Sequence, residues 1–241
     1  MILADQPTCF GDDVIAAVSS RDDGTMLDRT RGNRHDEYTV EHRRRFCRRA
    51  GFDYDDCVYQ IISYADEATF DRLVEVDQAN TDGAYADVLY TETSGVGLFL
   101  PIADCVGTIV YDPVRRALAM AHLGRHASVT KMMRKTIEHF VRKGSRAGDL
   151  IIWMSPSVAQ ADYRMDYFDH ADDLDWQEYA ASRADGVYLD IAGFNRALAV
   201  GAGVPSSSIH VSIINTAHDP HYFSHSQGDT TGRFAVLAAI R

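Results

Sequence analysis

Basic residues are in short supply in this chain of 241 residues, which has 24 lysines and arginines against 35 aspartates and glutamates. The formal net charge of −11 repels nucleic-acid phosphates and anionic membrane surfaces, unless a local basic patch reverses the field. One basic cluster occurs, "EHRRRFCRR" at 41–49, and we interpret its arginines as one face of a helix rather than a nucleic-acid footprint. The sequence therefore predicts neither a nucleic-acid partner nor a membrane partner.

Long apolar runs are also missing. No stretch approaches the roughly 18 apolar residues that a membrane-spanning helix needs. The first residues, "MILADQPTCFGDD", lack a cationic start followed by an apolar segment, so we expect a cytoplasmic protein. No C-x-x-C pair occurs, which argues against a zinc ribbon and a thioredoxin-type redox motif. Reduced thiols are expected at Cys9, Cys47, Cys57 and Cys105, because a chain of this size does not need disulfide staples.

Composition breaks, linkers and internal repeats are absent, so we expect a single domain over residues 1–241. Strand-like runs outnumber helical ones, which predicts an α+β fold with a mixed β-sheet sandwich core and helices packed against it. Helical spacing of apolar residues predicts helices at 37–51, 127–144 and 191–204, with Gly51 and Gly144 as stops and with Met132 and Met133 in the core.

Apolar and β-branched runs predict the strands. The run at 208–215 is interpreted as a final central strand, and the C-terminal run at 232–241 is left open between a strand and a helix. The run at 66–76 is interpreted as a short helix or helical turn and 167–179 as an acidic surface segment. The other predicted strands lie early in 12–26 and at 55–63, 86–91, 95–102, 105–112, 115–124 and 149–155.

Cys105 and His122 stand at opposite ends of a predicted hairpin, "CVGTIVYDPVRRALAMAH". A tight turn centred between Pro113 and Val114 would place the two side chains directly opposite each other on one face, with Cβ atoms about 4.5–5.5 Å apart. That spacing suits a thiolate–imidazolium pair or two ligands of one metal. The alternative is a buried thiol and a core histidine without a chemical role.

The details of the hairpin leave its register open. Pro113 disfavours the mirror-image turns of two-residue hairpins, so a longer loop is an alternative. A slip of one residue would put Cys105 and His122 on opposite faces. Gly107 and Gly124 remove side chains next to the pair, which would leave room for a ligand.

Three segments follow one another in the middle of the chain: "YADVLYT" (85–91), "IADC" (102–105) and "AHLG" (121–124). They resemble the "ADALVT", "TADC" and "AHAGW" elements of the multicopper polyphenol oxidase, or laccase-domain, family, whose members are regarded as purine nucleoside phosphorylases with adenosine deaminase activity. The resemblance is nearly full length, because further segments are similar to family motifs at 40–46, 153–166, 189–212 and 215–237.

The resemblance implies that the protein acts on a purine nucleoside and phosphate, with a catalytic zinc held by three residues. Cys105 and His122 match the cysteine of "TADC" and the histidine of "AHAGW". The first histidine ligand, in the family's "QVHG", has no counterpart, because "QIIS" (60–63) places Ile62 there and no histidine occurs between His42 and His122. The candidates for the missing donor are Tyr64, Asp66, Glu67 and His126.

Other positions also depart from the family motifs. Arg125 replaces the tryptophan of "AHAGW", Ser155 replaces the first glycine of "GPAIG", and Ala161 and Asp162 replace both cysteines of "GPCC". Arg233 and Asn195 lie in segments that match the family, with a structural and a functional role both open.

Three hypotheses follow for the site around Cys105 and His122. The first is a zinc-dependent purine nucleoside phosphorylase or adenosine deaminase. The second is a relative of altered or absent activity that has lost the complete zinc site. The third is a metal-free enzyme in which Cys105 is the nucleophile and His122 its partner.

Overall fold

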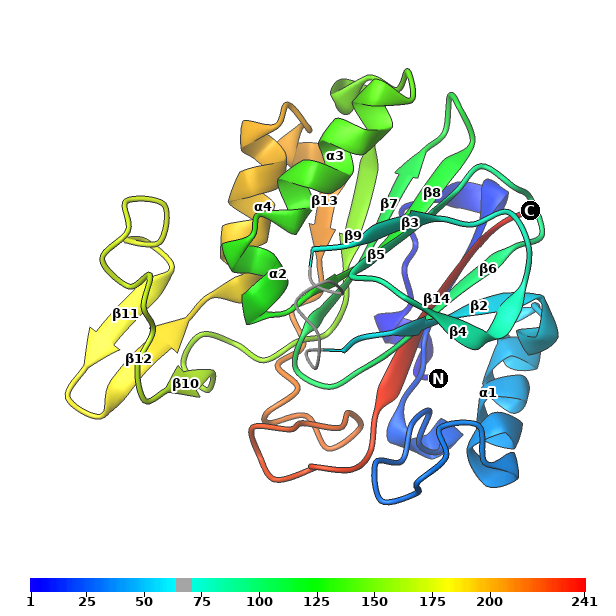
Figure 1. Ribbon diagram of the computed structural model, residues 1–241, viewed down its shortest axis with the longest axis horizontal. Coiled ribbons are helices and arrows are strands. Elements are labelled where there is room, and N and C mark those ends of the chain that lie inside the picture. Colours follow the sequence, from blue (N-terminus) through cyan, green and yellow to red (C-terminus); the bar gives the residue numbers. More distant parts are fainter. Residues whose placement is uncertain (64–70) are drawn as a thin grey trace.

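The computed structural model of the protein describes residues 1–63 and 71–241. Strands in this part of the chain form two large sheets, which lie against each other in the centre of the molecule (Figure 1). The first sheet has β6 at its centre, and its order is β1 (Val14–Val18), β14 (Phe234–Ile240), β6 (Gly97–Ile102), β2 (Cys57–Ile61) and β4 (Asn80–Tyr85). The C-terminal run, left open by the sequence, is thus the strand β14.

The second sheet is mixed, with parallel pairs at both edges and antiparallel pairs between them. Its order is β13 (Ile209–Val211), β9 (Ile151–Met154), β7 (Val106–Asp112), β8 (Ala117–Leu123), β5 (Val88–Thr91) and β3 (Leu73–Glu75). The expectation of a central strand at 208–215 was wrong, because β13 lies at the edge. The expected helix at 66–76 was wrong where the structure describes it, since β3 lies there.

Helices cover the outer faces of both sheets (Figure 1). α1 (Glu37–Ala50) packs on the first sheet, whereas α2 (Arg125–Val129), α3 (Met132–Arg142) and α4 (Ile191–Gly201) pack on the second. Between the sheets, Ile109 and Met120 of the second sheet contact the cluster that contains Leu98 and Val236 of the first. The predicted α+β sandwich with packed helices is therefore confirmed.

Alternation along β8 explains how its alanines fit a buried strand. Leu118 and Met120 face the other sheet, while Ala117, Ala119 and Ala121 face the helices, where small side chains let α3 pack closely. Met132 and Met133 of α3 are buried in that layer, as expected. The expected helix at 127–144 is wrong in one respect, because Lys131, with φ of 58°, separates α2 from α3.

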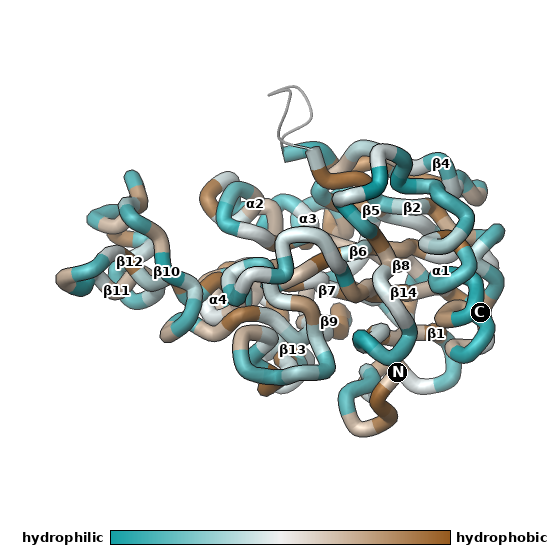
Figure 2. Tube along the Cα trace, turned by 90° about the horizontal axis from the view of Figure 1, so that it is seen from below, coloured by the Kyte–Doolittle hydropathy of each residue, from teal (hydrophilic) through white to brown (hydrophobic). Residues whose placement is uncertain are grey.

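A third, small sheet of β10 (Arg164–Met165), β12 (Gly186–Leu189) and β11 (Ala180–Arg183) projects to one side (Figure 2). The segment 167–179, predicted as acidic surface, also contributes to the core, because the Trp176 ring stacks on Phe194 with centroids 3.8 Å apart. Among the described residues, no helix combines the length and the apolar character that crossing a membrane requires.

Candidate active site

Cys105 lies where the chain crosses from β6 of the first sheet to β7 of the second. The preceding residue, Asp104, adopts the left-handed conformation with φ of 71° and is buried. Its carboxylate accepts hydrogen bonds from Thr216 Oγ1 and the Ser226 backbone N–H, at 2.7 Å each. These bonds compensate an unfavourable backbone conformation and hold the turn that presents Cys105.

His122 lies on β8 between the two sheets, with 4% of its surface exposed. Its backbone N–H donates to the Asp87 carbonyl at 2.8 Å, and its Nδ1 lies 3.4 Å from Asp87 Oδ1. An imidazole that directs Nδ1–H to this carboxylate has its Nε2 turned to the side of Cys105. Asp87, directly before β5, is a site residue that the sequence patterns did not indicate.

The register of the β7–β8 hairpin differs from the expected one by two residues. His122 is paired with Gly107, and the chain turns through residues 113–116, with Arg116 at φ of 55°. The expected direct opposition of Cys105 and His122 was wrong, because Pro113 opens a loop longer than two residues. A shift of two residues keeps every side chain on its predicted face, so the two residues are diagonal neighbours.

The thiol of Cys105 and the imidazole of His122 face the same point in space. A Cβ atom added at Gly124 would lie 3.0 Å from Cys105 Sγ and 3.2 Å from His122 Cε1. Gly124 thus leaves space for the pair itself. The space beside Gly107 is filled by apolar side chains, because a Cβ there would lie 2.9 Å from both Ile102 and Val236.

Charges around the pair favour an imidazolium. Burial lowers the pKa of His122, but the negative charge and hydrogen bond of Cys105, together with Asp87, outweigh burial and raise the pKa to about 9. His122 is therefore protonated at neutral pH. Burial also raises the pKa of Tyr163, and Cys105 raises it further, so that the phenol stays neutral.

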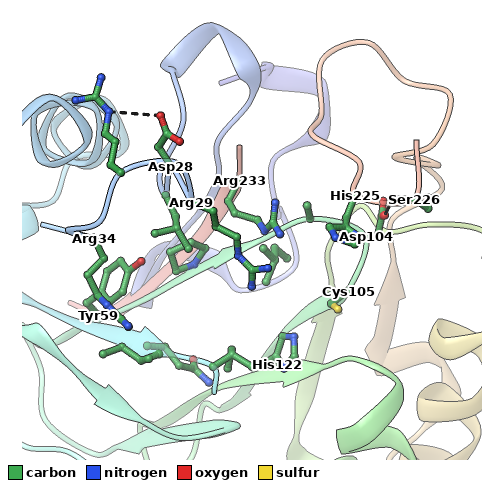
Figure 3. A pocket seen from close by; sticks show the side chains of 18 of the residues that line it. Asp28, Arg29, Arg34, Tyr59, Asp104, Cys105, His122, His225, Ser226 and Arg233 are labelled. Carbon is green, nitrogen blue, oxygen red and sulfur yellow. Dashed lines mark hydrogen bonds and ion pairs between the residues drawn. The ribbon is translucent and has the colours of Figure 1, made fainter. Parts of the chain in front are cut away.

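Cys105 and His122 open onto a pocket of about 470 Å³, which residues from several elements line (Figure 3). β2 contributes Tyr59, Gln60 and Ile61, and the loop before α1 contributes residues of 27–34. Four arginines line the pocket, and in Figure 3 two of them, Arg29 and Arg233, point into it across from the Cys105–His122 pair. The four are Arg29, Arg31, Arg34 and Arg233.

The arginines at 41–49 do not line this pocket. Arg43 is fully buried, and its guanidinium donates to Met26 O at 2.8 Å, Arg34 O at 2.6 Å and Tyr54 Oη at 3.0 Å. Arg43 therefore fixes the loop that carries the pocket arginines. A sequence signal for that loop exists in "DRTRGNR" (28–34), a basic stretch in an acidic chain, although no motif or spacing marks it as part of a site.

Several residues in family-like segments have structural contacts. Asn195 is buried, and its Nδ2 donates to Ser128 Oγ at 2.7 Å and Ile191 O at 2.8 Å, which ties α4 to α2. Ser155 Oγ accepts a hydrogen bond from the Gly107 N–H at 2.9 Å. Neither residue lines the pocket, whereas Arg233 does.

Metal donors around the pair are incomplete in the described part of the chain. Ile62 lines the pocket where the family resemblance places the first histidine ligand. His126 is exposed on α2 and outside the pocket lining, and Tyr64, Asp66 and Glu67 lie outside the described residues. Within residues 1–63 and 71–241, no group of three His, Cys, Asp or Glu side chains is placed to hold a metal ion. This donor set does not fit a three-ligand catalytic zinc site.

Comparison with known proteins agrees with this architecture. A family model described as "Multi-copper polyphenol oxidoreductase laccase" matches residues 20–241. The chain is similar to a solved structure described as Bacillus licheniformis hypothetical protein YfiH, with a TM-score of 0.82 at 24% sequence identity. That similarity covers 95% of this chain and 93% of the other, and it shows a common fold.

Two curated relatives carry the names of enzymes. A purine nucleoside phosphorylase of Deinococcus radiodurans is 29% identical over 177 residues, which is 70% of this chain and 67% of the relative. A protein of an unknown prokaryotic organism, named adenosine deaminase RL5, is 26% identical over 147 residues, which is 57% of this chain and 55% of the relative.

Proposed function

The chain belongs to the multi-copper polyphenol oxidoreductase laccase family, and from that membership we propose that it cleaves a purine nucleoside with phosphate at the pocket beside Cys105 and His122. The names of its relatives, purine nucleoside phosphorylase and adenosine deaminase, support chemistry on a purine nucleoside. One observation carries the proposal: a single pocket has the Cys105–His122 pair on one side and arginines on the other.

Phosphorolysis makes two demands that the pocket meets. A phosphate oxygen forms a bond to the anomeric carbon of the sugar, while the bond from that carbon to the purine nitrogen breaks. The electron pair of the broken bond leaves with the purine, which takes up a proton. The arginines favour the phosphate anion, and the opposite side of the pocket supplies the proton.

His122 is the residue to which we assign this proton. Asp87 orients the imidazole through Nδ1, so that Nε2 lies on the side of Cys105 and the pocket. Burial lowers the pKa of His122, but Cys105 and Asp87 raise it to about 9, which favours the protonated imidazole. His122 therefore acts as the general acid, and Cys105 and Asp87 act through it.

Zinc, by the family resemblance, would be held by Cys105 and His122 and would supply a Lewis acid when bound. Because the described donor set lacks a third ligand, no step above passes through a metal. Metal analysis of protein purified with and without added zinc tests this point. If the protein binds almost no zinc per chain at saturating zinc and still turns over normally, the metal-free reaction described above is supported.

The test of the function is to incubate adenosine and inosine with phosphate and to measure the free purine base. We expect base release by the wild-type protein and its loss in His122→Ala and Cys105→Ala. Cys9→Ala is the matched control, because Cys9 is a half-buried thiol outside the pocket lining. Base release no higher than that of Cys105→Ala, at every zinc level, would reject phosphorolysis.

Ile62, in the place of the first family ligand, favours a second candidate, a relative that binds a nucleoside without converting it. This candidate predicts nucleoside binding by calorimetry with no release of base or, from adenosine, of ammonia. A third candidate, Cys105 as a metal-free nucleophile, requires a reactive thiol at neutral pH. Alkylation of Cys105 slower than that of a free thiol would reject it.

A further inference from the structure

Arg29 and Arg233 lie on two backbone segments that are hydrogen-bonded to each other. The Met26 N–H donates to Arg233 O at 2.8 Å, and the Arg29 N–H donates to Thr231 O at 3.1 Å. The Arg233 N–H donates in turn to Thr25 Oγ1 at 3.0 Å. This pairing holds the loop before α1 against the segment before β14, so the two guanidinium groups enter the pocket together (Figure 3).

The Arg233 guanidinium is buried without a carboxylate partner among the described residues. The residue is 6% exposed, and its Nη1 donates to the backbone carbonyls of Asp229, at 3.3 Å, and Gly232, at 2.6 Å. The nearby Asp229 carboxylate pairs with Arg21 instead. Burial and the charge of Arg29 lower the pKa of Arg233 more than Cys105, Asp104 and Asp229 raise it, as expected for two neighbouring cations.

The Arg29 side chain likewise has no hydrogen bond or ion pair in the described part of the chain. Arg31, two residues on, lines the same pocket but contacts Asp36 at 3.1 Å and Asp28 at 3.4 Å. Arg34, the third arginine of this loop, also has no ion pair in the described part of the chain, and its guanidinium lies over the Tyr85 ring at 5.9 Å. The loop therefore presents one arginine that is already neutralised, Arg31, and two that are not. This difference provides an internal comparison for the pocket.

We propose that Arg29 and Arg233 form a binding site for a phosphoryl group. Asp104 also lines this cavity, but its carboxylate accepts hydrogen bonds from Thr216 and Ser226, and no ion pair joins it to either arginine in the described part of the chain. Two guanidinium groups that face one cavity without an ion-paired carboxylate are costly until an anion lies between them, and planar guanidinium groups match phosphate oxygens in pairs. The bound group is inorganic phosphate or the phosphate of a nucleotide. The proposal rests on the proposed function for the reaction that this group enters, but the binding itself needs no turnover.

The buried Arg43 is the positioning residue of this site. Its guanidinium holds Met26 O and Arg34 O, which stand on either side of Arg29 in the loop. Both bonds are made by a rigid fork that a lysine amine does not reproduce. Arg43→Lys is therefore expected to weaken phosphate binding although residue 43 does not touch the pocket.

Calorimetric titration with inorganic phosphate and, separately, with adenosine 5′-monophosphate tests the site. Arg29→Gln and Arg233→Gln are each expected to weaken binding of at least one of them by about ten- to a hundredfold, the usual effect of losing a charged hydrogen bond. Arg31→Gln is expected to change it less, and Arg146→Gln, an exposed arginine outside the pocket, not at all. Arg233→Lys and circular dichroism separate lost binding from lost folding.

The two sources give different results. If the phosphate is inorganic, the protein binds adenosine and phosphate together; if it belongs to a nucleotide, adenosine 5′-monophosphate binds and excludes free phosphate. Either result supports the site. Unchanged affinity for both ligands in the folded Arg29→Gln and Arg233→Gln variants would overturn it, even if wild-type phosphorolysis is found. The wild-type protein could also bind phosphate without any turnover, while the two variants lose that binding. This result would reject the proposed function but support the phosphate site.

Discussion

The two sides of the pocket are built in opposite ways. On the strand wall, formed by Asp87, Cys105 and His122, the imidazole faces the Asp87 carboxylate and the Cys105 thiol, which together raise its pKa. On the loop wall, formed by Arg29 and Arg233, the guanidinium groups have no carboxylate partner in the described part of the chain. The polar groups of the strand wall therefore have partners within the protein, whereas the positive charges of the loop wall need a bound anion to balance them.

Replacing His122 by asparagine is the strongest test of this division. A general acid contributes about 10²–10⁴ to a rate, so we expect kcat for base release to fall by that factor. Phosphate affinity should stay within about twofold, because the loop wall does not depend on His122. His210→Asn, on the edge strand β13, is the matched control. Equal losses of kcat and phosphate affinity would show that the two walls are one unit.

Replacing Arg43 perturbs the loop wall through a residue that lies outside the pocket. Arg43→Ala leaves Met26 O, Arg34 O and Tyr54 Oη without their donor in the interior, so we expect the free energy of unfolding to fall by about 3 kcal/mol. Urea denaturation measures it. Arg48→Ala, on the same helix and 62% exposed, should change it by less than about 0.5 kcal/mol. Similar values for both variants would contradict a structural role for Arg43.

Asp87→Asn tests whether the carboxylate positions His122. We expect kcat to fall by about ten- to a hundredfold, because an amide orients the imidazole but does not stabilise its positive charge. Alkylation of Cys105 at neutral pH should also slow, since fewer imidazolium groups lie beside the thiol to activate it. A fall in kcat with unchanged alkylation would mean that Asp87 acts only in the fold, for example through its bond to the Asp71 N–H.

The two walls also differ in how far the sequence predicts them. The strand wall follows from local patterns, because alternation along β7 and β8 keeps Cys105 and His122 on one face even though the register was off by two. The loop wall depends on contacts between segments about 200 residues apart, such as Arg29 with Thr231. Hydrophobic periodicity along the chain does not predict contacts between such distant segments. The arginines at 41–49 were conspicuous in the sequence, yet they support the fold, whereas the pocket arginines lie in a loop without a repeating pattern.

Two glycines beside the strand wall provide the smallest and most selective perturbation. Gly124→Ala would place a methyl group 3.0 Å from Cys105 Sγ and 3.2 Å from His122 Cε1, and Gly107→Ala would place one 2.9 Å from Ile102 and Val236. Both overpack the interior, so urea denaturation should show a loss of about 1 kcal/mol in each.

Only Gly124→Ala should also change the chemistry, because its methyl group pushes the thiol and the imidazole apart by a few tenths of an ångström and weakens their pairing. We therefore expect slower alkylation of Cys105 in Gly124→Ala and an unchanged rate in Gly107→Ala. Equal alkylation rates in both variants, at equal loss of stability, would mean that the thiol and the imidazole do not depend on their contact. The strand wall would then be ordinary core packing, and the loop wall alone would mark the site.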